Sequence, residues 1–173
     1  YIPKAIIYET KAVDKIQEEL MVMQKLDHPF TIRYLGGFET KSCITMISEF
    51  AFGGELYTRM KQDFRMSESV TKFYAAEIAE ALNYLHNSLH IVYRDLKPEN
   101  ILISGTGHIK LCDFGFAVSM NASSASGPGP STSNFLTDNC GTAMYVAPEI
   151  VAPSGKSLHS FPADWWSFGC VVY

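Results

Sequence analysis

The sequence predicts a mixed α+β fold, with strands and a helix in the first 50 residues and helices plus one short hairpin after them. Two patterns predict it: β-branched and aromatic runs bounded by turn residues, and apolar residues that recur at helical spacing. The third observation is size. With 173 residues, 47% of them hydrophobic, the chain can bury one substantial core without disulfides or metals.

Residues 2–8 are apolar and β-branched, which predicts a strand, although Pro3 cannot donate a ladder hydrogen bond there. A helix is predicted over residues 15–26, where apolar side chains recur at helical spacing. Asp14, with Gln17 three residues later, is typical of the capping box at the start of such a helix. The apolar stripe of this helix consists of Ile16, Leu20, Met23 and Leu26.

Two hairpins are predicted. The first joins strands at residues 30–38 and 43–50 through a polar turn at 39–42. The second joins short apolar strands at 101–103 and 109–111 through a turn that contains two glycines.

Two further helices and one loop are predicted. Ser67 can cap a long helix, whose stripe consists of Val70, Phe73, Tyr74, Ile78, Ala81, Leu82 and Leu85. Residues 119–134 are dominated by Ser, Gly, Pro and Asn, with almost nothing apolar to bury, which predicts a disordered loop. Residues 164–173 are apolar on nearly all sides, which indicates a buried central helix.

Charge and cysteine content exclude several kinds of partner. The formal net charge of -4 argues against nucleic acid or an anionic membrane as the main partner, because both reward clustered Lys and Arg. The cysteines are scattered without a Cys-x-x-Cys pair, which predicts reduced thiols in an intracellular protein. No apolar run approaches the roughly 18 residues of a membrane span, and no secretory leader opens the sequence. We therefore expect a cytoplasmic protein, with the nucleus as the alternative.

Three short motifs carry the candidate chemistry. Tyr-Arg-Asp-Leu-Lys-Pro-Glu-Asn at residues 93–100 is followed by Asp-Phe-Gly at 113–115 and by Ala-Pro-Glu at 147–149. A solvated turn of mixed charge would explain one such motif, but not three in this order.

The residue types in these motifs suit phosphoryl transfer. Asp95 can accept or orient the proton of an attacking hydroxyl, and Lys97 can neutralise charge on the transferred group. Asn100 and Asp113 offer the hard oxygen ligands that Mg²⁺ selects. A short hairpin between Asn100 and Asp113 can bring both ligands to one place.

In this order the motifs resemble the signature set of the protein kinases. The resemblance implies a bilobal kinase fold, incomplete in this chain, with a small lobe and hinge over residues 1–50 and a large lobe over 51–173. It also implies ATP and Mg²⁺ as cofactors, and protein substrates with Ser or Thr acceptors, which Lys97 and Thr142 fit. By the same resemblance, Phe114 packs inward against Tyr93.

Several local sequences narrow the resemblance to the AGC group, relatives of the cyclic-nucleotide-dependent and ribosomal-protein kinases. They are Tyr93 in place of His, Gly-Gly-Glu-Leu at 53–56, Lys-Phe-Tyr-Ala-Ala-Glu-Ile at 72–78, Cys-Gly-Thr at 140–142 and Asp-Trp-Trp at 164–166. In basic-directed members, glutamates at the positions of Glu55 and Glu99 pair with arginines upstream of the acceptor. The alternative is two surface glutamates.

The resemblance also implies residues for ATP binding in the small lobe. A lysine that grips the ATP phosphates while paired with a helix glutamate would be Lys4, with Glu19 as its partner. Pro3 departs from the usual apolar residue, and an exposed lysine near the chain terminus is the alternative.

The hinge is placed by the same alignment. Ser48 becomes the gatekeeper, and Glu49 and Ala51 bound the segment that offers backbone groups to adenine. Leu102 and Cys112 are expected to line this nucleotide site. The Cys112 thiol is either alkylatable or buried and inert, depending on its pKa and exposure.

The activation segment departs from the family. The family's phosphothreonine, two residues before Cys-Gly-Thr, is replaced by Asp138. This carboxylate can pair with Arg94 and supplies about one negative charge where a phosphate supplies nearly two. Weaker dependence on an activating kinase is therefore expected, with Thr137 as the alternative phosphosite.

A complete kinase domain runs to about 250 residues, so this sequence is expected to be a fragment of one. No Gly-rich loop precedes Lys4, and later large-lobe helices are missing. The leading hypothesis is an ATP-dependent Ser/Thr protein kinase, and the alternative is a non-catalytic kinase-like binding module or inactive fragment. Regulatory domains or subunits outside the chain, and the physiological substrate, stay open.

Overall fold

The computed structural model describes residues 1–10, 12–63, 65–120, 142–151 and 160–173. Its strands are β1 Ile2–Pro3, β2 Tyr34–Glu39, β3 Cys43–Ser48, β4 Gly54–Glu55, β5 Ile91–Val92, β6 Ile101–Ile103, β7 Ile109–Leu111 and β8 Val118–Ser119. Its helices are α1 Lys4–Thr10, α2 Val13–Lys25, α3 Leu56–Asp63, α4 Glu68–Asn83, α6 Pro148–Val151 and α7 Phe161–Val172. Two short helical turns are η1 Tyr84–Ser88 and η2 Pro98–Asn100.

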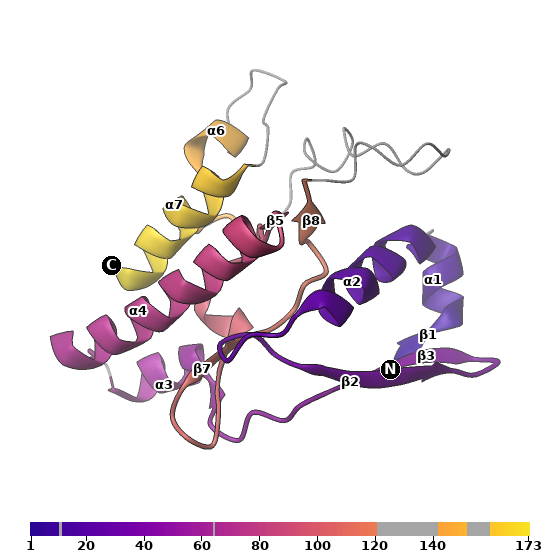
Figure 1. Cartoon of the computed structure of the whole chain (residues 1–173), viewed down its shortest axis with the longest axis horizontal. Coiled ribbons are helices and arrows are strands. Elements are labelled where there is room, and N and C mark those ends of the chain that lie inside the picture. Colours follow the sequence, from indigo (N-terminus) through magenta and orange to yellow (C-terminus); the bar gives the residue numbers. More distant parts are fainter. Residues whose placement is uncertain (11, 64, 121–141, 152–159) are drawn as a thin grey trace.

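A three-stranded antiparallel sheet, in the order β1-β3-β2, forms the first part of the fold. Helices α1 and α2 lie on one side of this sheet, and α3, α4 and α7 lie together in the other part of the molecule (Figure 1). The predicted turn between β2 and β3 is confirmed, because Thr40 Oγ1 accepts a hydrogen bond from the Cys43 backbone nitrogen at 3.0 Å. The α+β prediction is therefore correct.

The predicted strand over residues 2–8 is wrong beyond its first two residues. Only Ile2 and Pro3 pair with β3, and the chain then turns into α1. Proline lacks an N–H group, and its fixed φ suits the start of a helix as well as a strand. In α1 only Ile7 is buried, so just one face of the helix is covered by the rest of the protein.

The predicted helix at 15–26 is confirmed as α2, but its capping box is wrong. The N-cap is Ala12, which makes no side-chain hydrogen bond, and the helix begins one residue before Asp14. Asp14 therefore lies in the first helical turn, where its negative charge favours the N-terminal end of the helix dipole.

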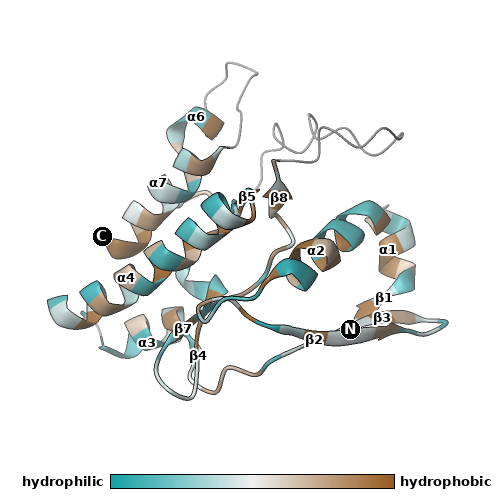
Figure 2. Ribbon diagram, in the orientation of Figure 1, coloured by the Kyte–Doolittle hydropathy of each residue, from teal (hydrophilic) through white to brown (hydrophobic). Residues whose placement is uncertain are grey.

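The long helix α4 begins as predicted, since Ser67 Oγ accepts a hydrogen bond from the Val70 backbone nitrogen at 3.4 Å. The second half of its apolar stripe is buried, whereas Val70 and Phe73 near its start are exposed. The first turns of α4 reach past the core, which explains the difference (Figure 1). Figure 2 shows hydrophobic residues of α4 interleaved with hydrophilic ones, as expected of a helix with one buried side.

The second hairpin is confirmed with the predicted boundaries. Strands β6 and β7 pair antiparallel, with Ile101 opposite Leu111 and Ile103 opposite Ile109. Gly107 closes the turn with φ +87°, a conformation that favours glycine. β4 pairs with the outer edge of β6 and completes a three-stranded sheet.

Helix α7 is confirmed, but its predicted burial on nearly all sides is wrong. Asp164 and Ser167 are buried, whereas Trp165 and Trp166 are 40% and 50% exposed. Among the described residues, α7 packs along one side against α4 (Figure 1). The predicted loop at 119–134 also needs correction at its start, because Ser119 belongs to β8, paired with β5. Residues 121–134 lie outside the described part of the chain.

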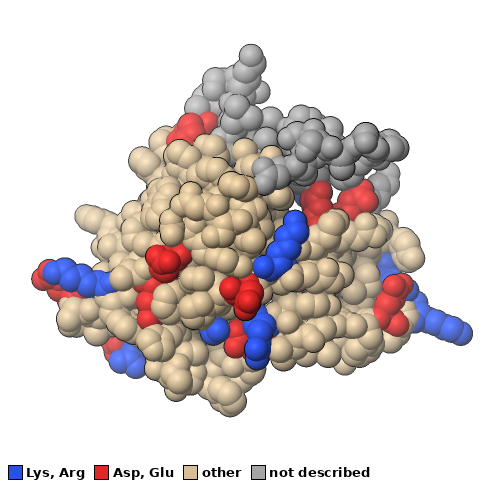
Figure 3. All heavy atoms as spheres, viewed as in Figure 1, with Lys and Arg blue, Asp and Glu red and all other residues tan. Residues whose placement is uncertain are grey.

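One hydrophobic core joins the two parts of the fold, because α2, α4 and the β6–β7 hairpin contribute to the same cluster. Its members include Met23, Ile78, Leu82, Leu85, Tyr93, Ile101, Leu111 and Phe114. No helix in the described ranges is long and apolar enough to cross a membrane. On the face shown in Figure 3, basic and acidic side chains are interspersed rather than gathered by sign.

Candidate active site

A single buried carboxylate holds the start of the loop that carries the first motif, residues 93–100. Asp164, at the start of α7, accepts hydrogen bonds from the backbone nitrogens of Tyr93 and Arg94, both at 2.8 Å. The ring of His86 lies 2.7 Å from the same carboxylate. Arg94 has φ +70°, which is uncommon for a residue other than glycine. The carboxylate of Asp164 therefore helps to hold a strained turn just before Asp95.

The Asp95 carboxylate is surrounded by three polar side chains, those of Lys97, Asn100 and Thr142. Lys97 Nζ and Asn100 Nδ2 both lie 2.8 Å from Asp95 Oδ2. Lys97 Nζ also donates to Thr142 Oγ1 at 3.1 Å, and the Thr142 hydroxyl lies 3.5 Å from Asp95 Oδ1. The Asp95 side chain is 2% exposed. Two strong donors therefore occupy Oδ2, whereas among the described residues Oδ1 receives only the long contact from Thr142 and can accept a further hydrogen bond.

The hairpin β6–β7 brings the second motif to the first. Its ends are joined by a hydrogen bond of 3.0 Å from the Cys112 backbone nitrogen to the Asn100 carbonyl oxygen. Asp113 follows with φ +57°, and its exposed carboxylate accepts from the Gly115 backbone nitrogen at 3.3 Å. Phe114 is fully buried and meets the Tyr93 ring edge to face, with centroids 5.3 Å apart, which confirms the predicted packing.

Comparison with known proteins agrees with this geometry. The family model for the protein kinase domain matches residues 2–173. This chain belongs to the protein kinase family.

Three relatives show which kinases the chain is similar to. It is 40% identical to the cAMP-dependent protein kinase catalytic subunit of Arthrobotrys oligospora, over 99% of this chain and 30% of that protein. It is 41% identical to cAMP-dependent protein kinase type 3 of Saccharomyces cerevisiae, over 99% and 39%. For ribosomal protein S6 kinase 2 alpha of Xenopus laevis the identity is 39%, over 94% and 21%. The chain is thus an AGC-like Ser/Thr protein kinase sequence that spans less than half the length of these relatives.

Protein kinases generally use ATP and Mg²⁺, and two residues of this kinase fit the metal. The Asn100 amide nitrogen makes both of that side chain's hydrogen bonds, so its oxygen accepts none from the described residues. The Asp113 carboxylate is exposed. The described residues contain no group of three or more metal-ligating side chains. Asn100 and Asp113 therefore fit Mg²⁺ that reaches the site with nucleotide phosphates, rather than a cage made of protein ligands alone.

The predicted pair between Lys4 and Glu19 is not made in this structure. Lys4 begins α1 instead of continuing a strand, and its amine lies 2.5 Å from Glu39 Oε1. Glu19 instead faces the Asp-Phe-Gly motif, since a Cβ on Gly115 would lie 3.7 Å from Glu19 Oε2. Burial, followed by the charge of Asp113, raises the pKa of the Glu19 carboxyl.

The segment predicted to be the hinge has two backbone groups without a backbone partner in the described part of the chain. Glu49 donates its N–H to the Arg33 carbonyl, and the Ala51 carbonyl accepts from the Gly54 nitrogen. Among the described residues, the Glu49 carbonyl and the Ala51 N–H have no such partner. Ser48 is the last residue of β3 and is exposed. That these groups contact adenine stays a prediction.

The Glu49 side chain is bound away from that position. Its Oε1 accepts from the Arg33 backbone nitrogen and from Lys110 Nζ, both at 2.8 Å. Burial pushes the pKa of the Glu49 carboxyl upward, but these donors outweigh burial and the pKa is lowered. The side chain of Glu49 therefore links the predicted hinge to Lys110 of β7.

Cys112 and Leu102 both lie in the hairpin, half-buried. Burial, then the charges of Asp113 and Glu55, raise the pKa of the Cys112 thiol to about 12. Its Sγ lies 3.4 Å from the Asn100 carbonyl oxygen, to which it donates. This environment favours the inert alternative for Cys112, because the thiolate is the reactive form.

Glu55 and Glu99 differ in their surroundings. Glu55 is exposed on β4, whereas Glu99, in η2, is half-buried, and its buried Oε2 has no hydrogen-bond partner among the described residues. Burial, then the negative charge of Glu99, raises the pKa of Tyr145. Glu99 is thus not an ordinary surface glutamate.

Arg94 is buried, and its Nε donates to the Phe116 carbonyl at 2.6 Å. The Arg94 side chain is near enough to α2 to affect Glu18 there. Burial, then the charge of Asp14, raises the pKa of the Glu18 carboxyl, and the positive charges of Arg94 and Lys15 oppose this rise. Thr137 and Asp138, the predicted partners and regulators of this arginine, lie outside the described residues.

Sequence reasoning missed the two buried carboxylates that organise the site. Asp164 was noted only as part of a family motif, although it holds the loop at 93–94. Glu77, on α4, binds the hairpin and was not singled out. A charged residue within an apolar helical stripe is the signal that could have found both, since an unpaired buried carboxylate is costly.

Proposed function

We propose that this protein is an ATP-dependent kinase that transfers the γ-phosphoryl group to Ser or Thr hydroxyls of proteins. The observation that carries the proposal is the cluster of Lys97, Asn100 and Thr142 around the Asp95 carboxylate. Residues 1–50 serve as small lobe and hinge, and residues 51–173 as part of the large lobe.

The residues of the chain divide the work of the reaction. Asp95 Oδ1 would orient the acceptor hydroxyl and take its proton as the hydroxyl oxygen bonds to the γ-phosphorus, while the bond from that phosphorus to the bridging oxygen breaks and ADP leaves. Lys97, held between Asp95 and Thr142, places a positive charge beside the transferred group. Asn100 and Asp113 would hold Mg²⁺. Bound Mg-ATP supplies the phosphoryl group and neutralises part of its charge.

A preference for basic substrates follows from Glu99. A buried carboxylate oxygen without a donor is costly, and an arginine guanidinium is a strong partner for it. The exposed Glu55, on β4 just after the predicted hinge, adds a second negative charge. We therefore propose substrates with an arginine upstream of the acceptor.

A kinase-like binding module without activity is the second candidate, and one observation favours it. Lys4 pairs with Glu39 rather than with Glu19, so the lysine expected to bind phosphate is turned elsewhere. In an active kinase, nucleotide binding would have to move Lys4 away from Glu39.

The proposal also covers the regulatory partners of the protein and its location in the cell. Two of the relatives named above are cAMP-dependent kinases, one of them described as a catalytic subunit. We propose that this chain, too, acts with regulatory domains or subunits. The free thiols of the described cysteines suit the cytoplasm or nucleus.

The test is phosphate transfer by the protein expressed from its full coding sequence. With radiolabelled ATP, the wild type should label a Ser peptide that carries an upstream arginine, and Asp95→Asn should lower the rate by about 10²–10⁴-fold. Asp63→Asn, in an exposed ion pair, is the control and should leave the rate unchanged. Absence of labelling by the wild type would favour the binding module. Equal labelling when glutamine replaces the upstream arginine would remove the role of Glu99.

A further inference from the structure

Glu77 is a buried carboxylate that the proposed chemistry does not use. It lies on α4 and is 6% exposed. Its two oxygens bind two consecutive residues: Oε1 lies 2.5 Å from His108 Nδ1, and Oε2 accepts from the Ile109 backbone nitrogen at 2.9 Å. A buried carboxylate is tolerated when donors satisfy both oxygens. Through these two contacts, the Glu77 side chain connects α4 to the start of β7.

The outer edge of β7 shows what Glu77 does there. The inner edge pairs with β6. On the outer edge, the Leu111 nitrogen donates to the Phe30 carbonyl, and the Leu111 carbonyl accepts from the Ile32 nitrogen, both at 2.8 Å. Ile109 is fully buried, and no strand of the described segments pairs with its outward N–H group. The carboxylate of Glu77 takes the place of that missing strand.

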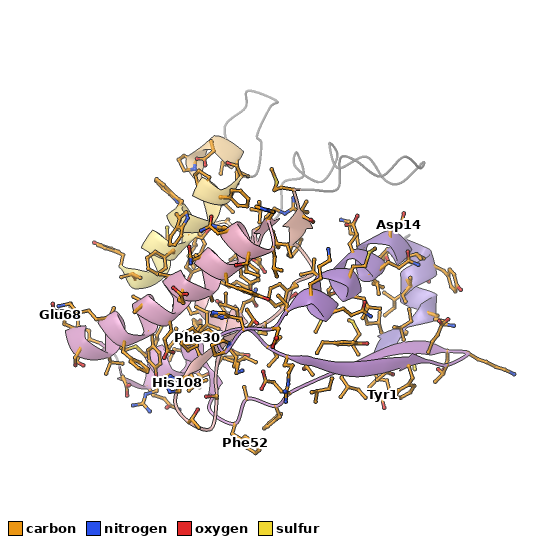
Figure 4. All side chains as sticks on the ribbon, viewed as in Figure 1. Tyr1, Asp14, Phe30, Phe52, Glu68 and His108 are labelled. Carbon is orange, nitrogen blue, oxygen red and sulfur yellow. The ribbon has the colours of Figure 1, made fainter. Side chains whose placement is uncertain are left out.

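His108 supports this contact from the side. Its ring lies 5.6 Å from the ring of Phe73, on α4, and 6.2 Å from that of Phe30. Figure 4 shows Phe30 and His108 close together beside α4. The aromatic neighbours restrict the imidazole, which keeps Nδ1 directed at Glu77. The other side of the ring is open to solvent, since the His108 side chain is 49% exposed.

The same hairpin carries both candidate magnesium ligands at its open end. Asn100 immediately precedes β6, and Asp113 follows β7 by two residues. The hydrogen bond from Cys112 to the Asn100 carbonyl ties these two ends together. A shift of β7 along β6 would move Asp113 away from Asn100, because pairing register sets which residues lie opposite each other.

We propose that Glu77 is a positioning residue for Asn100 and Asp113. By binding the Ile109 N–H, it holds β7 in register and so sets the separation of the two magnesium ligands; His108 keeps the carboxylate in place. This inference rests on the proposed kinase function.

The test compares three variants of the protein expressed from its full coding sequence. Glu77→Ala leaves the Ile109 N–H without an acceptor, and we expect the KM for Mg-ATP to rise on the order of tenfold. Glu77→Gln keeps an oxygen that can accept this N–H, so it should restore most of the wild-type KM. Glu80→Ala, an exposed glutamate of the same helix, is the matched control and should behave as wild type.

A second measurement does not depend on activity. Amide hydrogen exchange over residues 109–113 should be faster in Glu77→Ala than in wild type, and near wild type in Glu77→Gln. His108→Ala changes a half-exposed side chain, so it should fold, and it should accelerate exchange in the same segment by a smaller factor. Unchanged exchange in both Glu77→Ala and His108→Ala would overturn the inference, as would a Glu77→Gln variant as impaired as Glu77→Ala.

The two proposals can fail separately. If the wild type transfers no phosphate, the kinase proposal fails, and hydrogen exchange at 109–113 still decides whether Glu77 holds β7. If the wild type is active and Glu77→Ala keeps the wild-type KM for Mg-ATP, the positioning role fails while the kinase proposal stands.

Discussion

The side-chain nitrogen of Asn100 donates to Asp95 twice, to its backbone oxygen at 2.9 Å and to its Oδ2 at 2.8 Å. These two bonds make the candidate base and a candidate magnesium ligand one unit. They direct the Asn100 oxygen away from Asp95 and leave Asp95 Oδ1, which the Thr142 hydroxyl reaches only at 3.5 Å, for the proposed acceptor hydroxyl. A change at Asn100 therefore affects both functions.

Replacement of Asn100 by alanine should lower phosphate transfer by at least about 100-fold, because it removes a metal ligand and frees the Asp95 carboxylate to turn. The required Mg²⁺ concentration should rise as well. Steady-state rates over a magnesium titration measure both effects. Asn87→Ala, at an exposed asparagine of η1, is the control. A variant with the wild-type magnesium requirement would remove Asn100 from the metal site.

Asp164 should contribute strongly to stability. Replacement by alanine removes the acceptor for two buried backbone N–H groups and for His86. We expect the free energy of unfolding to fall by about 3 kcal/mol, the typical cost of removing one partner of a buried charged contact. Urea unfolding of the Asp164→Ala protein measures this. Asp63→Ala, at an exposed ion pair, should cost less than about 1 kcal/mol. Similar losses in both variants would contradict the anchoring role.

The cysteines should differ in their reaction with iodoacetamide. Hydrogen bonding from Thr40 lowers the pKa of the Cys43 thiol, whereas burial raises that of Cys112 to about 12. A thiolate forms as pH rises through the pKa, so at pH 8 Cys43 holds more thiolate and Cys112 stays protonated. Peptide mass spectrometry should therefore find Cys43 modified first, and Thr40→Ala should slow it. Earlier modification of Cys112 would contradict this order.

Asp138 should support activity without a phosphate. If its carboxylate pairs with Arg94, Asp138→Ala should lower activity, and Thr137→Ala should leave it nearly unchanged. Phosphate transfer by protein produced without an activating kinase compares the two. The opposite order would identify Thr137 as the phosphosite, and equal activity of Asp138→Ala and wild type would remove the built-in charge from the activation segment.

Local elements of the fold were predictable because their signals are short-range. The hairpin at 101–111 has its short apolar strands and its glycine turn within eleven residues, and Ser67 bonds a nitrogen only three residues away. The apolar run at 2–8 was ambiguous, because a short run without a clear period suits a strand or one face of a helix. In the folded protein the run forms α1 with Ile7 as its one buried residue.

The candidate site was predictable as a set of residues but not as a geometry. The ordered motifs identified Asp95, Lys97, Asn100 and Asp113 because residue type and spacing are visible in the sequence. The partner of Lys4 was not visible, since Glu19 and Glu39 are both within its reach along the chain. In the folded protein Lys4 begins α1, and its amine pairs with Glu39.

By itself, the sequence determined the family, the order of the motifs and the chemical types of the site residues. Only the tertiary structure decided which groups hold them. Asp164 bonds Tyr93 across 71 positions, and Glu77 bonds Ile109 across 32. Such contacts form because burial leaves backbone N–H groups and carboxylates in need of partners, and which partner lies near depends on how the whole chain packs.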